Sequence, residues 1–457
     1  MTTSTHSTAT AWQAPAFIPR DEVIAASNAV LAMPKLPLDV HETIMRISTL
    51  GLEWDIGLQH YVPRKAHAAR GRDGKKIGLF LMHGGAGDYK SVDGFARVFA
   101  EKFGYTVVSM TFPGRLYLDD PSHDWPGDTI DADGSVRTPQ WLTGERITPD
   151  QYDVISDASM RVKYGTRTLA RAKPGSRFYD RMAAWPAAFE DAMIEACSRH
   201  LPEADFTIYA HGHSTGGPFI AMLSQRVPNI AGLVALENSI FAYIGDEKER
   251  VMGLGAIEGF EESAASAGVL NDLFNDLYIR TWRDTARYRG PEALGQEGPS
   301  ALMRLPWLME EVLEAWERGK ARPQFKAEYS VTANLLDALE AAARAAAKRL
   351  RYDDAQTRAL IERYLGYTRE LTGPGVKPVP PILFGLAKDS RDNSPQAYRD
   401  VIEPMLRKMN PAPRVATTRF GAGVHVYSKP EKDLPNGIAP AAAKFYNDAI
   451  TNGFYEG

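Results

Sequence analysis

The sequence predicts an α/β fold with a mostly parallel central sheet and helices on both faces. Apolar runs at residues 76–82, 105–111 and 206–211 each lead into a turn that contains glycine. Helical patterns separate these runs along the chain, and two further runs follow at residues 230–237 and 380–387. Strands and helices that alternate in this way build parallel sheets with right-handed crossovers.

Residues 1–50 are predicted to be an N-terminal extension of this domain. The first ten residues are polar and lack the basic and apolar regions of a secretory signal. Helical patterns follow at residues 21–32 and 40–49. Residues 51–62 then alternate apolar and polar side chains, which indicates a half-buried strand or hairpin at a sheet edge.

Two long insertions are expected in the main domain, which would occupy residues 51–239 and 376–457. A chain of 457 residues is too long for one core of usual size. Residues 113–177 form an aromatic-rich excursion, and residues 240–375 carry apolar stripes at helical spacing, which predict a helical cap. The same stripes would also suit a second core or the interface of a homodimer.

Composition favours a small soluble substrate over a macromolecular partner. The net charge is only −4, so neither nucleic acid nor an anionic membrane surface is indicated as a partner. No apolar run reaches the ~18 residues of a membrane span, and a cytoplasmic location is expected. The single cysteine, Cys197, is expected to be a buried small side chain, and no cysteine and histidine spacing indicates zinc. The acidic stretch around His123 does not fit a calcium loop, so no metal is predicted.

The pentapeptide from Gly212 to Gly216 carries the predicted nucleophile, Ser214. A G-x-S-x-G between a strand and a helix places the serine on a sharp turn, with its hydroxyl exposed at the carboxyl end of the sheet. A Cβ at Gly212 or Gly216 would crowd this turn. His213, immediately before the serine, is expected to line the substrate pocket.

Two other turns carry the expected oxyanion donors and the expected general base. The run at residues 76–82 ends in His83 and a glycine-rich turn, whose backbone N–H groups could hold an oxyanion. Gly85 or Ala86 would be one donor and Thr215 the other. His83 belongs to this turn and is a candidate pocket residue. Far downstream, a last strand at residues 414–420 leads into a loop with His425, the expected general base.

At these positions the sequence resembles the serine α/β-hydrolase superfamily. The resemblance rests on the histidine and glycines of residues 83–87, the Ser214 elbow and the late His425, in the order that this superfamily uses. It implies an α/β-hydrolase fold with a helical cap inserted after the sixth strand, and it implies no cofactor. It also implies a triad acid, for which Asp389 is favoured over Glu237.

Acyl transfer to water is the activity that the resemblance implies, because the nucleophile is serine. Cleavage of a carboxylic ester, lactone or thioester is the favoured reaction. An amidase or aminopeptidase is the first alternative, since the glycine-rich turn and the elbow also look like those of proline iminopeptidases. A non-catalytic binding protein on the same scaffold is the second.

Overall fold

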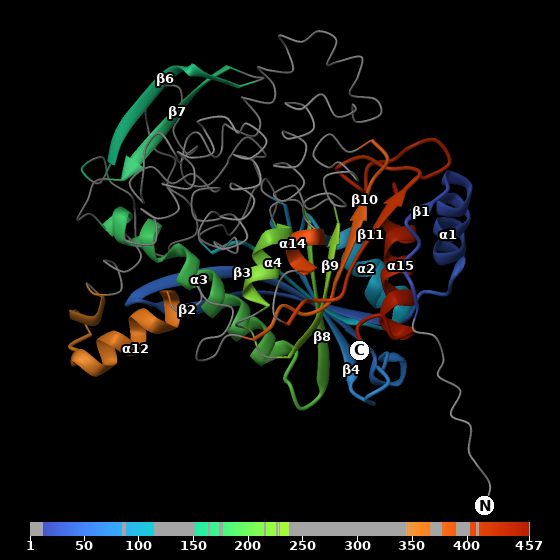
Figure 1. The fold of residues 1–457 in the computed structure, drawn as a ribbon, viewed down its shortest axis with the longest axis horizontal. Helices are drawn as coiled ribbons and strands as arrows, with labels where there is room; N and C mark the ends of the chain where they lie inside the picture. Colours follow the sequence, from blue (N-terminus) through green and yellow to red (C-terminus); the bar gives the residue numbers. More distant parts are fainter. Residues whose placement is uncertain are drawn as a thin grey trace, which may run out of the picture.

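The computed structural model describes the sheet and the helices around it (Figure 1). The described residues are 12–84, 88–113, 150, 152–162, 165–172, 177–213, 216–224, 227, 229–236, 344, 346–348, 350–365, 377–389, 403–407 and 411–456. They include only a small part of the predicted cap and excursion. The position of the cap after the sixth strand therefore stays a prediction.

A mostly parallel sheet organises the described part of the chain. Its nine strands lie in the order β1-β11-β10-β9-β8-β4-β5-β3-β2. β3 is antiparallel to its neighbours β2 and β5, and every other adjacent pair is parallel. The strands are β1 (Phe17–Ile18), β2 (Leu38–Thr49), β3 (Leu52–Pro63), β4 (Lys76–Met82), β5 (Thr106–Met110), β8 (Phe206–His213), β9 (Ile230–Leu236), β10 (Ile382–Leu386) and β11 (Val415–Phe420). The fold class predicted from the sequence is confirmed.

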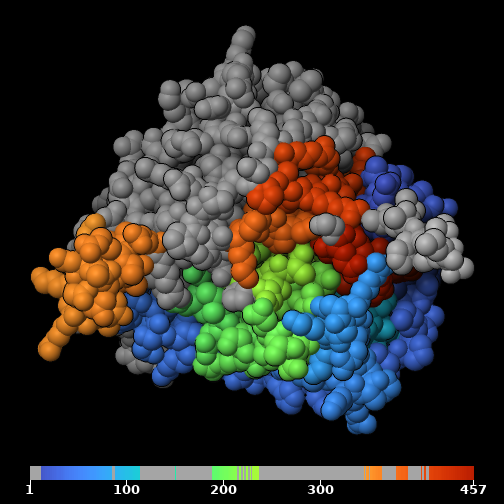
Figure 2. Space-filling view, turned by 60° about the horizontal axis from the view of Figure 1, so that its bottom comes forward, coloured from blue at the N-terminus to red at the C-terminus, as the bar shows by residue number. Residues whose placement is uncertain are grey.

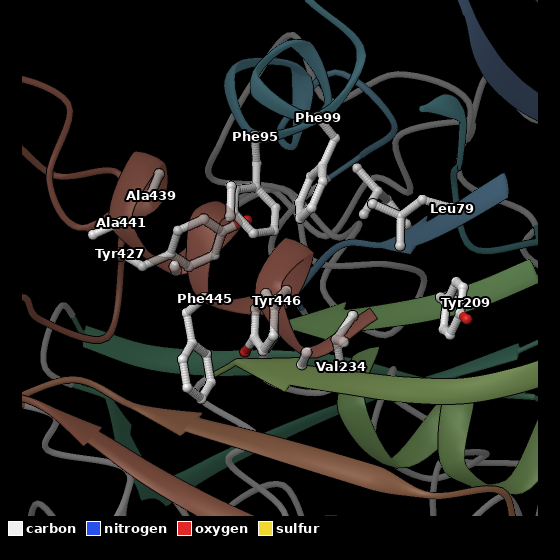
Figure 3. Packing of buried hydrophobic residues seen from close by; sticks show 14 of the residues in the cluster. Leu79, Phe95, Phe99, Tyr209, Val234, Tyr427, Ala439, Ala441, Phe445 and Tyr446 are labelled. Carbon is white, nitrogen blue, oxygen red and sulfur yellow. The ribbon is translucent and has the colours of Figure 1, made fainter. Parts of the chain in front are cut away.

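Helices cover both faces of this sheet (Figure 1). On one face, α2 (Asp93–Phe103) and α15 (Ala439–Thr451) enclose a core that includes Leu79 and Leu81 (Figure 3). On the other face lie α3 (Arg177–His200) and α4 (Gly216–Leu223), and the Met82 side chain approaches the start of α4. Side chains of a strand alternate between faces, so a strand buried on both sides must be apolar, as β4 is after Lys76.

The first and last segments that the structure describes lie side by side (Figures 1 and 2). β1 pairs with the outer edge of β11, in the register Phe17 with Arg419. The Trp12 ring lies 5.4 Å from the Phe445 ring, and the Arg414 guanidinium donates to the Trp12 carbonyl oxygen at 3.2 Å. α1 (Arg20–Ala32) then packs along α15. The N-terminal segment therefore covers a sheet edge that β11 would otherwise expose.

The helix predicted over residues 40–49 is wrong, because these residues belong to β2. β2 pairs with β3 along its whole length, from Leu38 opposite Pro63 to Thr49 opposite Leu52. Met45 and Ile47 are buried, whereas Ile44 is 52% exposed. The backbone hydrogen bonds to β3 outweigh the weak helical spacing, and part of the predicted N-terminal extension is thus a strand of the sheet.

Further elements lie in the two predicted insertions and between β10 and β11. β6 (Tyr152–Val162) and β7 (Gly165–Ala172) form an antiparallel pair within the predicted excursion. α12 (Asp354–Leu365) lies in the predicted cap range, and α14 (Glu403–Arg407) lies between β10 and β11 in the chain.

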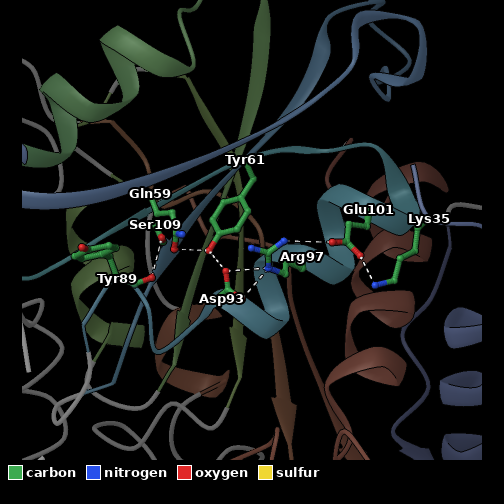
Figure 4. A network of polar contacts seen from close by, with 8 residues as sticks. All are labelled: Lys35, Gln59, Tyr61, Tyr89, Asp93, Arg97, Glu101 and Ser109. Carbon is green, nitrogen blue, oxygen red and sulfur yellow. Dashed lines mark hydrogen bonds and ion pairs between the residues drawn. The ribbon is translucent and has the colours of Figure 1, made fainter. Parts of the chain in front are cut away.

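Polar contacts fix the start of α2 against β3 (Figure 4). The Tyr61 hydroxyl lies 2.9 Å from Asp93 Oδ1 and 2.7 Å from Gln59 Oε1. Asp93, the first residue of α2, also accepts a hydrogen bond from Arg97 Nε at 2.8 Å. A carboxylate in the first turn is favoured by the helix dipole. The network therefore anchors the helix that follows the glycine-rich turn.

Candidate active site

The predicted elbow has the strand and the helix that its sequence requires. β8 ends at His213 and α4 begins at Gly216, so Ser214 and Thr215, which lie outside the described residues, connect the two. β8 lies between β4 and β9 near the middle of the sheet.

Glycine is required on both sides of this connection. A Cβ on Gly212 would lie 2.3 Å from the Gly216 carbonyl oxygen, and one on Gly216 would lie 2.5 Å from the His83 carbonyl oxygen. These approaches are closer than any real Cβ contact, so the expected crowding is confirmed. The second approach also shows that the elbow and the glycine-rich turn touch through their backbones.

His83 is part of the structure of the glycine-rich turn. Its side chain is completely buried and is stacked on Phe112, with the ring centroids 3.9 Å apart. The Phe112 N–H donates to His83 Nε2 at 3.2 Å, so the proton is assigned to Nδ1, which donates to the Gly84 carbonyl at 2.6 Å. The role of His83 in a substrate pocket, like the donor roles of Gly85 and Ala86 outside the described residues, stays a prediction.

The far end of the glycine-rich turn is held by Asp88. Its Oδ1 accepts hydrogen bonds from the N–H groups of Lys90 and Ser91, at 2.8 and 2.9 Å. Tyr89 follows, and its N–H donates to Thr111 Oγ1 at 3.1 Å. These contacts were not predicted from the sequence, although an aspartate in a turn commonly accepts a hydrogen bond from the backbone two residues on.

The loop that carries His425 runs beside the end of β10. The Asp389 N–H donates to the Gly423 carbonyl oxygen at 3.0 Å, and the Lys388 N–H donates to that of Ala422 at the same distance. Gly423 has a φ of 92°, a conformation that L side chains rarely adopt. The loop can therefore turn sharply, so that His425 comes two residues after the backbone contact with Asp389.

The two candidate acids have different positions relative to this loop. Asp389 is exposed, and its backbone N–H is hydrogen-bonded to the loop that carries His425. Glu237 directly follows β9 and lies outside the described residues, and β9 is separated from β11 by β10. The backbone arrangement thus brings Asp389 alongside the loop that carries His425.

The His213 side chain connects the elbow to the loop that carries His425. Its Nε2 lies 2.8 Å from the carbonyl oxygen of His425, so this nitrogen carries the donated proton. The His213 ring lies 5.0 Å from that of His425 and 4.9 Å from that of Tyr427, which meets it edge-on. Burial, and then the neighbouring His425, lower the pKa of His213 well below its ordinary value. His213 is therefore neutral at physiological pH.

His211, two residues upstream, belongs to the core. It is completely buried beside Phe95, and neither ring nitrogen has a hydrogen-bond partner of normal geometry. Burial lowers the pKa of His211 to about 3. The nearby Val234 backbone has a smaller effect that raises this pKa, although it forms no hydrogen bond of normal geometry with the ring.

The described residues contain neither a metal-binding cluster nor a membrane-spanning helix. No group of three or more histidine, cysteine, aspartate or glutamate side chains in this part of the chain is arranged to hold a metal ion. The acidic stretch around His123 lies outside it. Among the helices described, none combines the length and apolar character needed to cross a membrane.

Comparisons with known proteins find only distant structural likeness. No family model and no curated protein matches the chain. A thermostable esterase from Pseudomonas putida ECU1011 is 14% identical, with a TM-score of 0.34 over 97% of this chain and 92% of that chain. The Francisella virulence factor BioJ is 11% identical, with a TM-score of 0.36 over 93% and 89% of the two chains. The Pyrococcus horikoshii acylaminoacyl peptidase is 11% identical, with a TM-score of 0.39 over 93% of this chain and 44% of that chain.

Proposed function

Because the chain has the α/β-hydrolase fold, we propose that it is a serine hydrolase that cleaves a carboxylic ester, lactone or thioester. One observation carries the proposal: three turns from distant parts of the sequence meet at the carboxyl ends of β4, β8 and β11. The elbow touches the glycine-rich turn at the His83 carbonyl, and His213 bonds the loop of His425. A nucleophile, an oxyanion donor and a base must meet in this way for acyl transfer.

In the proposed cycle, Ser214 attacks the acyl carbonyl while His425 accepts its proton. Backbone N–H groups of Thr215 and of Gly85 or Ala86 donate to the oxyanion. His425 then protonates the leaving alcohol or thiol, and water, deprotonated by the same imidazole, releases the acid from the acyl-enzyme. These steps need no group beyond the chain itself and water.

Asp389 is proposed to orient the His425 imidazole, with Glu237 as the alternative. Support for Asp389 comes from its backbone hydrogen bond to Gly423, because Gly423 lies in the loop that carries His425. A carboxylate in this role holds one imidazole tautomer and stabilises the imidazolium that forms.

The proposal is tested with purified protein, p-nitrophenyl acetate and a fluorophosphonate probe. Wild-type protein should hydrolyse the ester and be labelled, and Ser214→Ala should lose labelling and ~10⁶ of kcat while keeping its circular dichroism spectrum. Near-wild-type hydrolysis by Ser214→Ala would refute the mechanism.

The same assay separates the alternatives. Faster cleavage of proline p-nitroanilide than of the ester would indicate an aminopeptidase. Wild-type protein that is neither labelled nor active on either compound would be a binding protein on a hydrolase scaffold.

A further inference from the structure

We propose that His213 is a positioning residue that fixes the general base relative to the nucleophile. This inference rests on the proposed function, and it assigns His213 a role distinct from lining the substrate pocket. His213 precedes Ser214 directly in the chain, and its imidazole donates to the backbone carbonyl of His425. One side chain thus joins the backbone of the nucleophile to the backbone of the base.

The hydrogen bond at His213 is short and comes from a supported ring. Its length of 2.8 Å, from Nε2 to oxygen, is at the short end for a nitrogen donor. The edge-on contact with Tyr427, a buried residue two positions after His425, supports the ring from the same loop. The imidazole therefore contacts the loop on both sides of Val426, which is itself 53% exposed.

Backbone hydrogen bonds hold this loop on both sides of His425. The backbone bonds from Lys388 and Asp389 reach Ala422 and Gly423. Ile438 donates to the Tyr427 carbonyl after it. The bond from His213 is received at His425 itself, on the residue whose ring must reach the serine.

The neutral state of His213 suits this role. A neutral imidazole with its proton on Nε2 donates to the carbonyl and places no positive charge next to His425. The pKa of His213 lies well below the ordinary histidine value, so the ring does not take up the proton that His425 receives from the serine. His425 is thus left to act as the sole base of the pair.

The experiment compares His213→Phe, which keeps an aromatic ring against Tyr427 but has no donor, with His213→Gln, whose amide can restore the donor. His60→Phe, a change to a half-buried histidine on β3 away from the site, is the control. Two readouts are used: kcat and KM for p-nitrophenyl acetate, and hydrogen exchange of the backbone amides at residues 421–429.

His213→Phe should lower kcat by ~10–100-fold with little change in KM, because a base displaced by about 1 Å costs up to ~10² in rate. Its amides at residues 421–429 should exchange faster than in the wild type. His213→Gln should restore much of both values, and His60→Phe should match the wild type in both.

Wild-type kcat and exchange in a folded His213→Phe would overturn the inference. So would a fall in kcat without faster exchange, because His213 would then act on the substrate directly. If His213→Phe does not fold, His213→Leu takes its place in the comparison with His213→Gln. Absence of ester hydrolysis and of labelling in the wild type would instead refute the proposed function, and exchange alone would then decide whether His213 anchors the loop.

Discussion

Replacement of His211 by leucine should reduce the acid sensitivity of the fold. The pKa of His211 is lowered to about 3 in the folded protein, against an ordinary value of 6.5, because the ring is buried among aromatic side chains. Between these two values the unfolded chain binds a proton that the folded protein does not. The contribution of His211 to stability therefore falls as the pH falls from about 6.5 towards about 3, and this contribution changes no further below pH 3.

The size of this effect follows from the two pKa values. Each pKa unit corresponds to about 1.4 kcal/mol, so His211 alone should cost about 2 kcal/mol between pH 6.5 and pH 5. The complete difference sets a limit of about 5 kcal/mol. His211→Leu, which cannot titrate, should lack this contribution.

Urea denaturation at pH 7.5, 6.5, 5.5 and 5.0 measures the free energy of unfolding of the two proteins. The exposed His67 offers a matched control, and His67→Gln should keep the acid dependence of the wild type. Parallel curves for wild type and His211→Leu would refute the reasoning, since His211 would then be protonated equally well in both states.

Three further predictions concern the elbow, the sheet edge and the triad acid. Gly216→Ala should lose ester hydrolysis and about 1–3 kcal/mol of stability, measured by urea denaturation, because its Cβ would meet the His83 carbonyl oxygen; a variant of normal activity would contradict the elbow geometry. Removal of residues 1–19 should cause self-association, measured by light scattering, because β11 would present an open edge. Removal of residues 1–11 should leave the edge covered and cause no self-association. Monomers after both deletions would contradict the role of β1 at this edge. Asp389→Asn should lower kcat by up to ~10⁴ and Glu237→Gln by much less, and the reverse order would transfer the role to Glu237.

Sequence patterns predicted most of the sheet but misassigned its first long strand. The error at β2 has a clear cause: Val40, Ile44 and Ile47 fit a helical face, whereas Met45, Ile47 and Thr49 fit a strand. Pairing with β3 decides between the two patterns, and such pairing is not visible in a local window. The two residues of β1 could not be predicted either, because they become a strand only beside β11.

Of the predictions about the site, the crowding at two glycines is confirmed, because local geometry dictates these residues. The glycines at 212 and 216 were expected because a strand that turns directly into a helix leaves no room for a Cβ. The bond from His213 to the His425 carbonyl was not expected, because it depends on where the chain brings two segments together. Residues 237 and 214 lie outside the described part, so the choice of acid and the nucleophile stay predictions.

The pairing of β1 with β11 means that one edge of the sheet can form only late in synthesis. Arg414 donates a hydrogen bond to the Trp12 carbonyl oxygen, although the two residues are 402 positions apart in the sequence. At about 5–20 residues per second, a ribosome needs about 20–80 s to make the chain between them. During that interval residues 12–18 have no partner strand, and their apolar side chains cannot be buried against β11 and α15. The sheet is completed only when β11 leaves the ribosome, so residues 12–18, which are made before the rest of the sheet, are among the last to be buried.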